Sequence, residues 1–246
     1  ISFGLAEGQR IGLIAKNGSG KTTLLNILSG KEGYDGGSIT YRRDVRVGYL
    51  EQTPVYPEGL SVLEACFWHS SPVTQLIKEY EHCMETEGNP GLEELLARME
   101  HEKAWDYERK IKQILSQLKI RDFDQPISQL SGGQLKRVAL ANVLIGNPDM
   151  LILDEPTAAL TQAEIDELFR IIKRLRADGC GIVYISHRMD EIKRISDRIT
   201  VMRDGEYVDT VVTNEVTKDE IINMMIGRVV YEDPKTQSEV DPDADV

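Results

Sequence analysis

The chain has 246 residues, of which 41% are hydrophobic and 28% are charged, with a formal net charge of −12. This length allows one large or two modest domains with a real core, and the composition excludes a disordered or collagen-like chain. Apolar runs such as residues 11–15 and 150–153 are far shorter than the roughly 20 residues of a membrane-spanning helix. No basic-then-apolar pattern opens the chain, so we predict no signal peptide.

The chain has three cysteines, Cys66, Cys83 and Cys180, and no two of them have CxxC spacing. This pattern favours a reducing compartment over a disulfide framework or a zinc site.

The charge is distributed unevenly along the chain. Residues 1–156 carry 17 basic and 22 acidic side chains, residues 157–230 carry 11 and 13, and residues 231–246 carry one and six. Residues 8–31 contain four lysine or arginine residues and no acid, which makes this stretch a candidate for binding an anion despite the net charge. The acidic, polar stretch 231–246 is typical of a linker or a disordered tail.

Strand and helix patterns alternate along the chain. Short apolar runs and apolar alternation predict strands, and apolar residues at helical spacing predict helices. The predicted strands are 1–6, 10–14, 45–50, 150–153, 181–186, and 198–203 joined to 206–212 by a hairpin turn at Asp204-Gly205. The predicted helices are 21–28, several between 60 and 125, 131–145, 162–177 and 217–226.

This alternation predicts an α/β fold with a mainly parallel sheet. A helical block at about 61–145 is inserted between two of its strands. One helix of the block should place a stripe of apolar side chains in the core, since they share one helical face: Trp105, Ile111, Ile114, Leu115 and Leu118.

Residues 15–23 read AKNGSGKTT and lie between a predicted strand and a predicted helix. This context is typical of a phosphate-binding loop, in which glycines let backbone N–H groups approach phosphates and the helix N-terminus adds positive charge. Lys21 would reach the β- and γ-phosphates, and the Thr22 hydroxyl would bind Mg²⁺. The first position of the pattern holds Ala15 instead of glycine, and the alternative is a glycine-rich turn with a chance lysine. The residues predicted to bind the cofactor here are Asn17, Gly18, Ser19, Gly20, Lys21, Thr22 and Thr23.

An apolar run ends in two carboxylates, Asp154 and Glu155. At the carboxyl end of a buried strand, both would lie where ligands bind in open α/β sheets. Asp154 suits a Mg²⁺ ligand, and Glu155 suits the general base that polarises an attacking water. The alternative is an acid pair that faces solvent.

Residues 130–134 read LSGGQ and open a predicted helix, with Ser131 as its N-cap. Two glycines and a serine at a helix N-terminus make a candidate anion site. Taken alone, the motif favours a capped helix start. The candidate residues are Ser131, Gly132, Gly133 and Gln134.

Two further motifs complete a series: Gln52 follows VGYLE, and His187 follows VYIS. Each alone is more typical of a polar residue at a strand end. The order of phosphate loop, Gln52, LSGGQ, LILDE and His187 resembles the ATP-binding domain of ABC ATPases, over residues 1 to about 228. The resemblance implies a P-loop NTPase core of ABC type over residues 1–230, with its helical subdomain at about 61–145.

The resemblance also implies roles and partners. Gln52 would contact Mg²⁺ and the attacking water, and His187 would contact the γ-phosphate. The LSGGQ turn of one domain would close over ATP on the phosphate loop of a second domain, so the expected cofactors are ATP and Mg²⁺. The expected location is the cytoplasm, at the inner face of the membrane beside a permease, and no DNA partner is expected.

The chain departs from the family pattern in two places. Members carry an aromatic residue that stacks on adenine some two dozen residues before the loop, and Phe3 lies too close to it. The chain opens without methionine, so we expect a domain that begins inside a longer protein, without its adenine platform and with weakened ATP affinity. After Pro156 the family loop commonly ends in Asp, where this chain has Thr161.

The two parts resemble different branches of the family. Residues 1–156 resemble the ABC-F branch, which acts on ribosomes, and residues 157–230 resemble the ATP-binding subunit of bacterial monosaccharide importers. Three hypotheses follow: an ATPase that powers a transporter for sugar import, an ABC-F type ATPase acting in translation or antibiotic resistance, and a chimera without a native partner. In the helical insert at 73–124 acids exceed bases, which disfavours a broad RNA surface.

Overall fold

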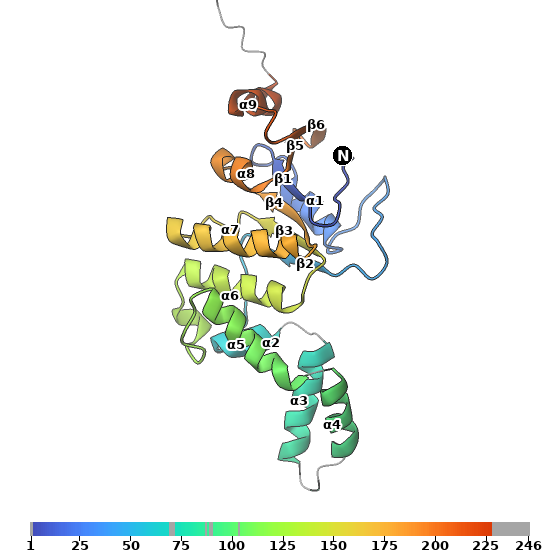
Figure 1. Cartoon of the computed structure of the whole chain (residues 1–246), viewed down its shortest axis with the longest axis vertical. Coiled ribbons are helices and arrows are strands. Elements are labelled where there is room, and N and C mark those ends of the chain that lie inside the picture. Colours follow the sequence, from blue (N-terminus) through green and yellow to red (C-terminus); the bar gives the residue numbers. More distant parts are fainter. Residues whose placement is uncertain (1, 69–71, 87, 89–90, 103, 228–246) are drawn as a thin grey trace, which may run out of the picture.

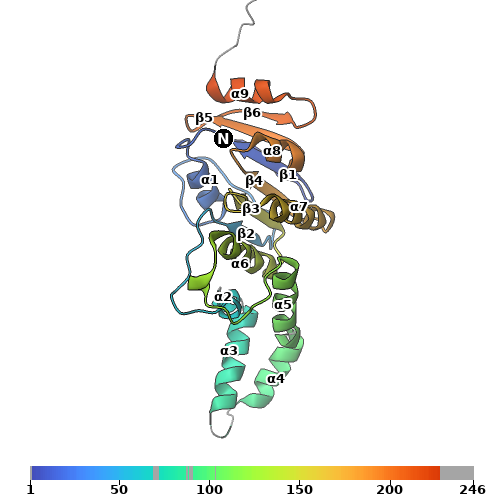
Figure 2. The ribbon, with the colours of Figure 1, turned by 90° about the vertical axis from the view of Figure 1, so that its left-hand side faces the viewer.

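The structure is a computed structural model that describes all residues except 1, 69–71, 87, 89–90, 103 and 228–246. Helices cover a central sheet, and a helical block extends away from one end of it (Figures 1 and 2). The strands are β1 (Arg10–Ile14), β2 (Val47–Leu50), β3 (Met150–Asp154), β4 (Gly181–Ile185), β5 (Arg198–Arg203) and β6 (Glu206–Val212). The α-helices are α1 (Lys21–Leu28), α2 (Val62–Trp68), α3 (Pro72–Glu85), α4 (Leu92–His101), α5 (Tyr107–Gln117), α6 (Gly132–Ile145), α7 (Gln162–Ala177), α8 (Met189–Ile195) and α9 (Lys218–Ile226). The short 3₁₀ helices are η1 (Ala104–Asp106) and η2 (Ile127–Gln129).

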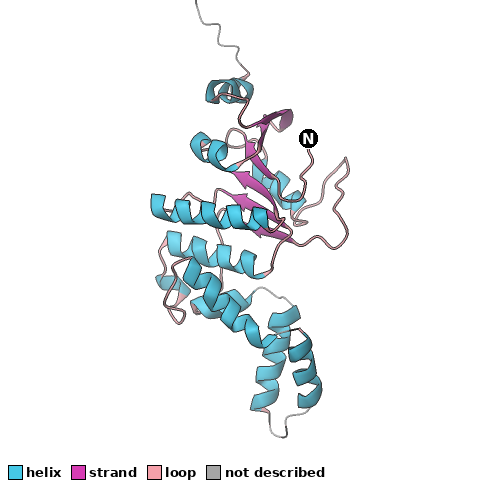
Figure 3. Cartoon of the chain, in the orientation of Figure 1, coloured by secondary structure: helices cyan, strands magenta, loops and turns pink. Residues whose placement is uncertain are grey.

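The strands lie in the order β2-β3-β4-β1-β5-β6. All neighbouring pairs are parallel except β5 and β6, which form the antiparallel hairpin predicted from the sequence. Because β1 to β4 run in one direction, their carboxyl ends meet at the same edge of the sheet. Figure 3 shows these strands between helices, which confirms the predicted α/β fold with a mainly parallel sheet.

Successive side chains of a strand pack in two different core layers, one on each face of the sheet. On β3, Ile152 packs in one cluster with Leu25 of α1. Its neighbours Leu151 and Leu153 belong to the other cluster, together with Phe169 of α7. Successive side chains of a strand point to opposite faces, so a continuous apolar strand can serve helices on both sides.

The helical block contains α2 to α6. Helices α3 and α4 lie side by side at its far end, in the blue-green part of the ribbon in Figure 2. Together with η1 they form a small core cluster: Leu76 of α3, Met99 of α4 and Ala104 of η1. Helix α6 packs against β2, α2 and α5, and so joins the block to the sheet.

Two expectations about local structure were wrong, and one helix was not predicted. Residues 2–6 form no strand, because they pair with no neighbouring strand in the described part of the chain. Trp105 is 48% exposed, since it lies in η1 ahead of α5 and meets Tyr80 edge-on at 5.1 Å between ring centroids. Helix α8 was not predicted, because its seven residues are too few to give a clear period. The other members of the apolar stripe do lie in the core: Ile111, Leu115 and Leu118 are buried, and Ile114 is partly buried.

The three cysteines are buried and free, as the spacing predicts. Within the described ranges, no helix has the length and apolar character needed to cross a membrane. The predicted acidic tail at 231–246 falls outside the described residues.

Candidate functional site

The predicted site residues outside the LSGGQ turn gather where four parallel strands end. The phosphate loop follows β1, Gln52 follows β2, Asp154 ends β3, and His187 lies two residues beyond β4. Strand order places β1 beside β4, β4 beside β3, and β3 beside β2. Sequence motifs that are far apart along the chain therefore share one edge of the sheet.

The loop between β1 and α1 has the backbone conformation of a phosphate cradle. Gly18 and Gly20 both have φ of 78°, a region that side chains disfavour, and a Cβ at either position would meet no atom within 4 Å. Gly20 is the N-cap of α1 without a side-chain cap, and the first turn of the helix contains no acid. The open, positively polarised helix end fits a phosphate group.

Some side chains of the loop bond to its main chain, and others are exposed to solvent. Lys21 Nζ donates to the main-chain oxygens of Ala15 and Lys16, each at 2.9 Å. Burial lowers the pKa of Lys21, while Glu155 and Asp154 oppose that shift. Ser19 is buried and donates to the oxygen of Lys16 at 2.8 Å. Five predicted cofactor residues of this segment are exposed: Asn17, Gly18, Gly20, Thr22 and Thr23.

Thr22 and Asp154 meet across 132 positions of sequence. Thr22 Oγ1 lies 3.5 Å from Asp154 Oδ2. Burial raises the pKa of Asp154, and the neighbouring charge of Glu155 adds to the effect. A hydroxyl beside a carboxylate is a hard oxygen donor set of the kind that Mg²⁺ prefers. A bound cation would offset the repulsion between the two acids, so these residues fit a magnesium ion.

Glu155 and His187 form the next pair of the site. His187 Nδ1 lies 3.0 Å from Glu155 Oε2, and the histidine side chain is 65% exposed while that of Glu155 is 9% exposed. Glu155 has a φ of 45°, and its N–H donates to the oxygen of Ile185 at 3.1 Å. That bond to the end of β4 holds a conformation uncommon for a residue with a side chain.

Gln52 is exposed and follows the end of β2. Its main-chain oxygen accepts a hydrogen bond of 2.8 Å from Lys136 of α6. Lys136 was not predicted to be a site residue. Ala139 and Leu140, three and four positions further, are buried on the same helix face. That spacing is the signal by which Lys136 could have been predicted to be buried.

The LSGGQ turn forms the predicted helix start. Ser131 Oγ accepts from the N–H of Gln134 at 3.2 Å, and Gln134 Oε1 accepts from the N–H of Ser131 at 2.9 Å, which is a capping box. A Cβ at Gly133 would lie 2.7 Å from the oxygen of Ala159, and the atom nearest to a Cβ at Gly132 also belongs to Ala159. Within one chain, the turn thus lies against the segment after Pro156 and its contacts are not with the phosphate loop.

A buried carboxylate ties two loops of the site together, and the sequence analysis missed it. Glu191 Oε2 accepts hydrogen bonds from the hydroxyls of Thr157 at 2.7 Å, Tyr184 at 2.9 Å and Ser186 at 3.3 Å. These hydroxyls flank Glu155 and His187 along the chain. Glu191 is one acid on a short helix that was not predicted, and no sequence motif marks it as the acceptor for these three hydroxyls.

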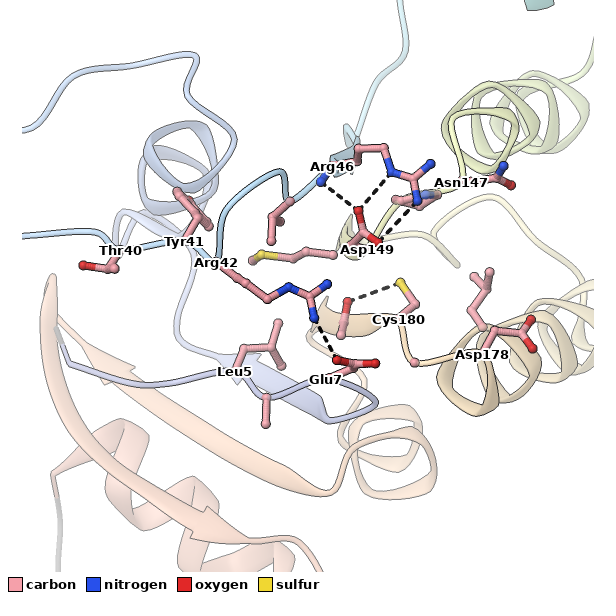
Figure 4. A pocket seen from close by; sticks show the side chains of 17 residues that line it. Leu5, Glu7, Thr40, Tyr41, Arg42, Arg46, Asn147, Asp149, Asp178 and Cys180 are labelled. Carbon is pink, nitrogen blue, oxygen red and sulfur yellow. Dashed lines mark hydrogen bonds and ion pairs between the residues drawn. The ribbon is translucent and has the colours of Figure 1, made fainter. Parts of the chain in front are cut away.

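A cavity of about 700 Å³ lies at the opposite edge of the sheet, where β3 and β4 begin. Figure 4 shows two pairs of opposite charges in it, Arg42 with Glu7 and Arg46 with Asp149. Arg42 pairs with Glu7 at 3.0 Å, and Arg46 donates to Asp149 at 3.0 and 3.3 Å. Since these charges satisfy each other, the cavity is a poorer anion site than the phosphate loop.

Comparisons with known proteins identify the family of the chain. A protein-family model described as ABC transporter matches residues 1–158. The chain is 37% identical over 213 residues to an uncharacterized ABC transporter ATP-binding protein, YfmR of Bacillus subtilis, covering 83% of this chain and 33% of that protein. It is 36% identical over 247 residues to the ribose import ATP-binding protein RbsA of Streptococcus agalactiae, covering 98% of this chain and 47% of that one.

The chain thus spans half or less of the length of these curated relatives. A solved structure of an ATP-binding cassette, a dimer in a post-hydrolysis state bound to ADP and Pi, has a similar fold, with a TM-score of 0.65 at 23% identity over 86% of this chain and 88% of that one. Domains of this family are ATPases. By its sequence match and its fold, the chain belongs to the ATP-binding domains of ABC transporters.

Proposed function

We propose that this chain binds and hydrolyses Mg-ATP at the interface of two head-to-tail ATP-binding domains, and that the reaction drives sugar import through a membrane permease. The observation that carries the proposal is the gathering of a phosphate cradle, an acid pair and His187 at one sheet edge, with His187 and Glu155 at 3.0 Å. Each group has a distinct task in phosphoryl transfer to water.

The phosphate loop would bind the triphosphate. Backbone N–H groups of the loop and of the first turn of α1 would donate to phosphate oxygens. Lys21 already reaches two main-chain oxygens of the loop, and it would exchange these acceptors for the β- and γ-phosphates. The exchange keeps the ammonium hydrogen-bonded in both states.

Magnesium would neutralise charge that develops on the phosphate oxygens. Thr22 and Asp154 would hold it, and Gln52 would approach from the end of β2. The proximity of Thr22 Oγ1 and Asp154 Oδ2 supports this assignment.

Glu155 would accept a proton from the attacking water as it forms its bond to the γ-phosphorus. His187 would orient Glu155 and donate toward the γ-phosphate. Since His187 is mostly exposed and Glu155 is nearly covered, the pair points from the sheet edge toward solvent or a partner surface.

A second domain would complete the site. The turn at residues 131–134 caps its own helix and lies beside Ala159 instead of its own phosphate loop, which supports a role toward the nucleotide of another copy. The relative named as a ribose import protein supports a sugar permease as the further partner. The chain would then lie on the cytoplasmic face of the membrane, bound to that permease.

The resemblance of residues 1–156 to ABC-F proteins supports the ribosome as a second candidate partner. The α3–α4 pair would be the element that reaches it. However, residues 72–106 contain nine acidic side chains and three lysine or arginine residues, which opposes binding to an RNA backbone. Co-sedimentation with ribosomes against co-purification with a membrane permease separates the two candidates.

The chimera hypothesis rests on the change of resemblance at residue 157. Alignments that cover 83% and 98% of the chain have to cross this point, and both relatives are ABC proteins. Long single reads across residues 145–165 of the source DNA test the hypothesis, since continuous natural coverage would remove it.

The experiment that tests the catalytic proposal compares the wild-type chain with Glu155→Gln. The variant should bind ATP as the wild type does and hydrolyse it at least ~100-fold more slowly, because it lacks the general base. Turnover that persists unchanged in Glu155→Gln would sink the assignment.

A further inference from the structure

Helix α6 carries a buried cation just beyond the LSGGQ turn. Lys136 is 5% exposed. Its Nζ donates to the main-chain oxygens of Glu51 at 2.6 Å, Gln52 at 2.8 Å and Asp154 at 3.3 Å. An ammonium group has three hydrogens, so these three carbonyls account for its whole donor capacity.

These carbonyls lie where two neighbouring strands part. β2 and β3 pair in parallel from Val47 opposite Met150 to Leu50 opposite Leu153. The next residues on each strand, Glu51 and Asp154, turn their oxygens to the ammonium instead of continuing the ladder. Lys136 thus spans the opening between the two strand ends and fixes its width.

The same opening separates two groups that the proposed function assigns to magnesium and water, Gln52 and Asp154. Lys136 donates hydrogen bonds to the main chain of both, and its charge also interacts with the carboxylate of Asp154. Groups that orient metal ligands in this way tune metal affinity without touching the metal.

Lys136 also belongs to the helix that begins with the LSGGQ turn. Helix α6 is held at its start by the capping box of Ser131 and Gln134, and half of its residues are buried. A displacement of the turn would therefore move Lys136 and, with it, the ends of β2 and β3.

We propose that Lys136 is a positioning residue that sets Gln52 relative to Asp154 for magnesium binding, and that it transmits the position of the LSGGQ turn to that site. The proposal rests on the proposed function. A residue that only anchors the helical block would affect stability and leave the response to magnesium unchanged.

The test uses Lys136→Met in the Glu155→Gln background, which isolates binding from turnover. ATP affinity is titrated with Mg²⁺ and with a chelator. The Mg²⁺ concentration that gives half-maximal ATP binding should rise ~10–100-fold relative to Glu155→Gln alone. The ATP affinity measured in chelator should stay within about threefold of the Glu155→Gln value. Equal loss of affinity with and without Mg²⁺ would overturn the proposal.

A matched control lies at the other end of α6. Lys110 donates to the oxygen of Ile145 at 3.2 Å and to Asn147 Oδ1 at 2.9 Å, far along the helix from the strand ends. Lys110→Met removes an ammonium of α5 that bonds to the C-terminal end of α6, and it should lower stability without changing the Mg²⁺ response. A Mg²⁺ response that shifts equally in both variants would contradict a specific role for Lys136.

Hydrogen exchange of residues 51–53 gives a readout independent of affinity. In the Glu155→Gln protein, Mg-ATP should slow exchange there, and Lys136→Met should abolish that protection while Lys110→Met keeps it.

If Lys136→Met does not fold, Lys136→Arg replaces it, since a planar guanidinium cannot donate to three carbonyls that surround one point. Normal Mg²⁺ affinity and normal protection in Lys136→Arg would then overturn the proposal.

The measurements separate the two hypotheses. Failure of the wild-type chain to hydrolyse ATP would contradict the proposed function. The Mg²⁺ dependence of binding and the exchange data would still report on Lys136, because neither requires turnover.

Discussion

His187 and Glu155 are 32 positions apart in sequence, yet His187 Nδ1 lies 3.0 Å from Glu155 Oε2. The main chain enforces this approach, since the N–H of Glu155 donates to Ile185 at the end of the neighbouring strand. The contact joins the ends of β3 and β4, and it lies at the centre of the proposed chemistry.

His187→Ala should reduce ATP turnover by at least ~100-fold while ATP affinity stays near the wild-type value, because the histidine orients the base and does not hold the loop. Its side chain is 65% exposed, so the melting temperature should change little. His101→Ala is the matched control, since that histidine is 85% exposed beside Glu102 and far from the site along the chain. A His187→Ala protein with wild-type turnover would contradict the pairing.

Lys21→Met should weaken ATP binding by about 10–100-fold, the loss expected when one charged hydrogen-bonding group is removed from a phosphate site. Equilibrium binding of a fluorescent ATP analogue measures this. The control is Lys31→Met, which removes a cation from the same basic stretch but from an exposed pair with Glu51. Equal losses in both variants would indicate a general charge effect instead of a phosphate-loop lysine.

The loop and the strand-end acids could be predicted because their signals are local. A strand, a glycine-rich turn and a helix follow one another within residues 10–28, and the structure has all three. The pairing of Glu155 with His187 required the strand order, which the sequence supplied only through the resemblance to a family.

Lys136 and Glu191 could not be recognised in this way. Their roles depend on oxygens that the fold brings from other strands and loops, and no spacing rule connects Lys136 to residue 51 or 154. Trp105 was predicted to be buried and is exposed. Its position fits the apolar spacing of the helix that follows, but it lies in the 3₁₀ helix η1, before that helix begins.

Glu191→Ala should lower the free energy of unfolding by about 3 kcal/mol, because three buried hydroxyls lose the oxygen that accepts their hydrogen bonds. Chemical denaturation measures the change. The neighbouring variant Asp190→Ala removes an exposed carboxylate and should cost less than about 0.5 kcal/mol. Similar losses in the two variants would show that the buried network contributes little.

The pair of Arg46 and Asp149 should give stability an acid-sensitive component. Hydrogen bonds from Arg46 lower the pKa of Asp149 to about 2 from 3.8. Since the native pKa lies below the unfolded one, the contribution is present at neutral pH and is lost as the pH falls from about 4 through about 2. Asp149→Asn should therefore flatten this part of the curve of melting temperature against pH. Asp178→Asn, on the same cavity, leaves the Arg46 pair intact and should keep the wild-type slope.

The central claim is that ATP is held between the phosphate loop of one domain and the LSGGQ turn of another. Light scattering of the Glu155→Gln protein after size-exclusion chromatography tests it most directly. We expect a monomer without nucleotide, a dimer with Mg-ATP, and a return to monomer when Ser131→Arg is added, since that substitution blocks the turn but not the loop. A mass that is independent of ATP, or a dimer that persists with Ser131→Arg, would show that the LSGGQ turn does not bind the nucleotide of a second domain.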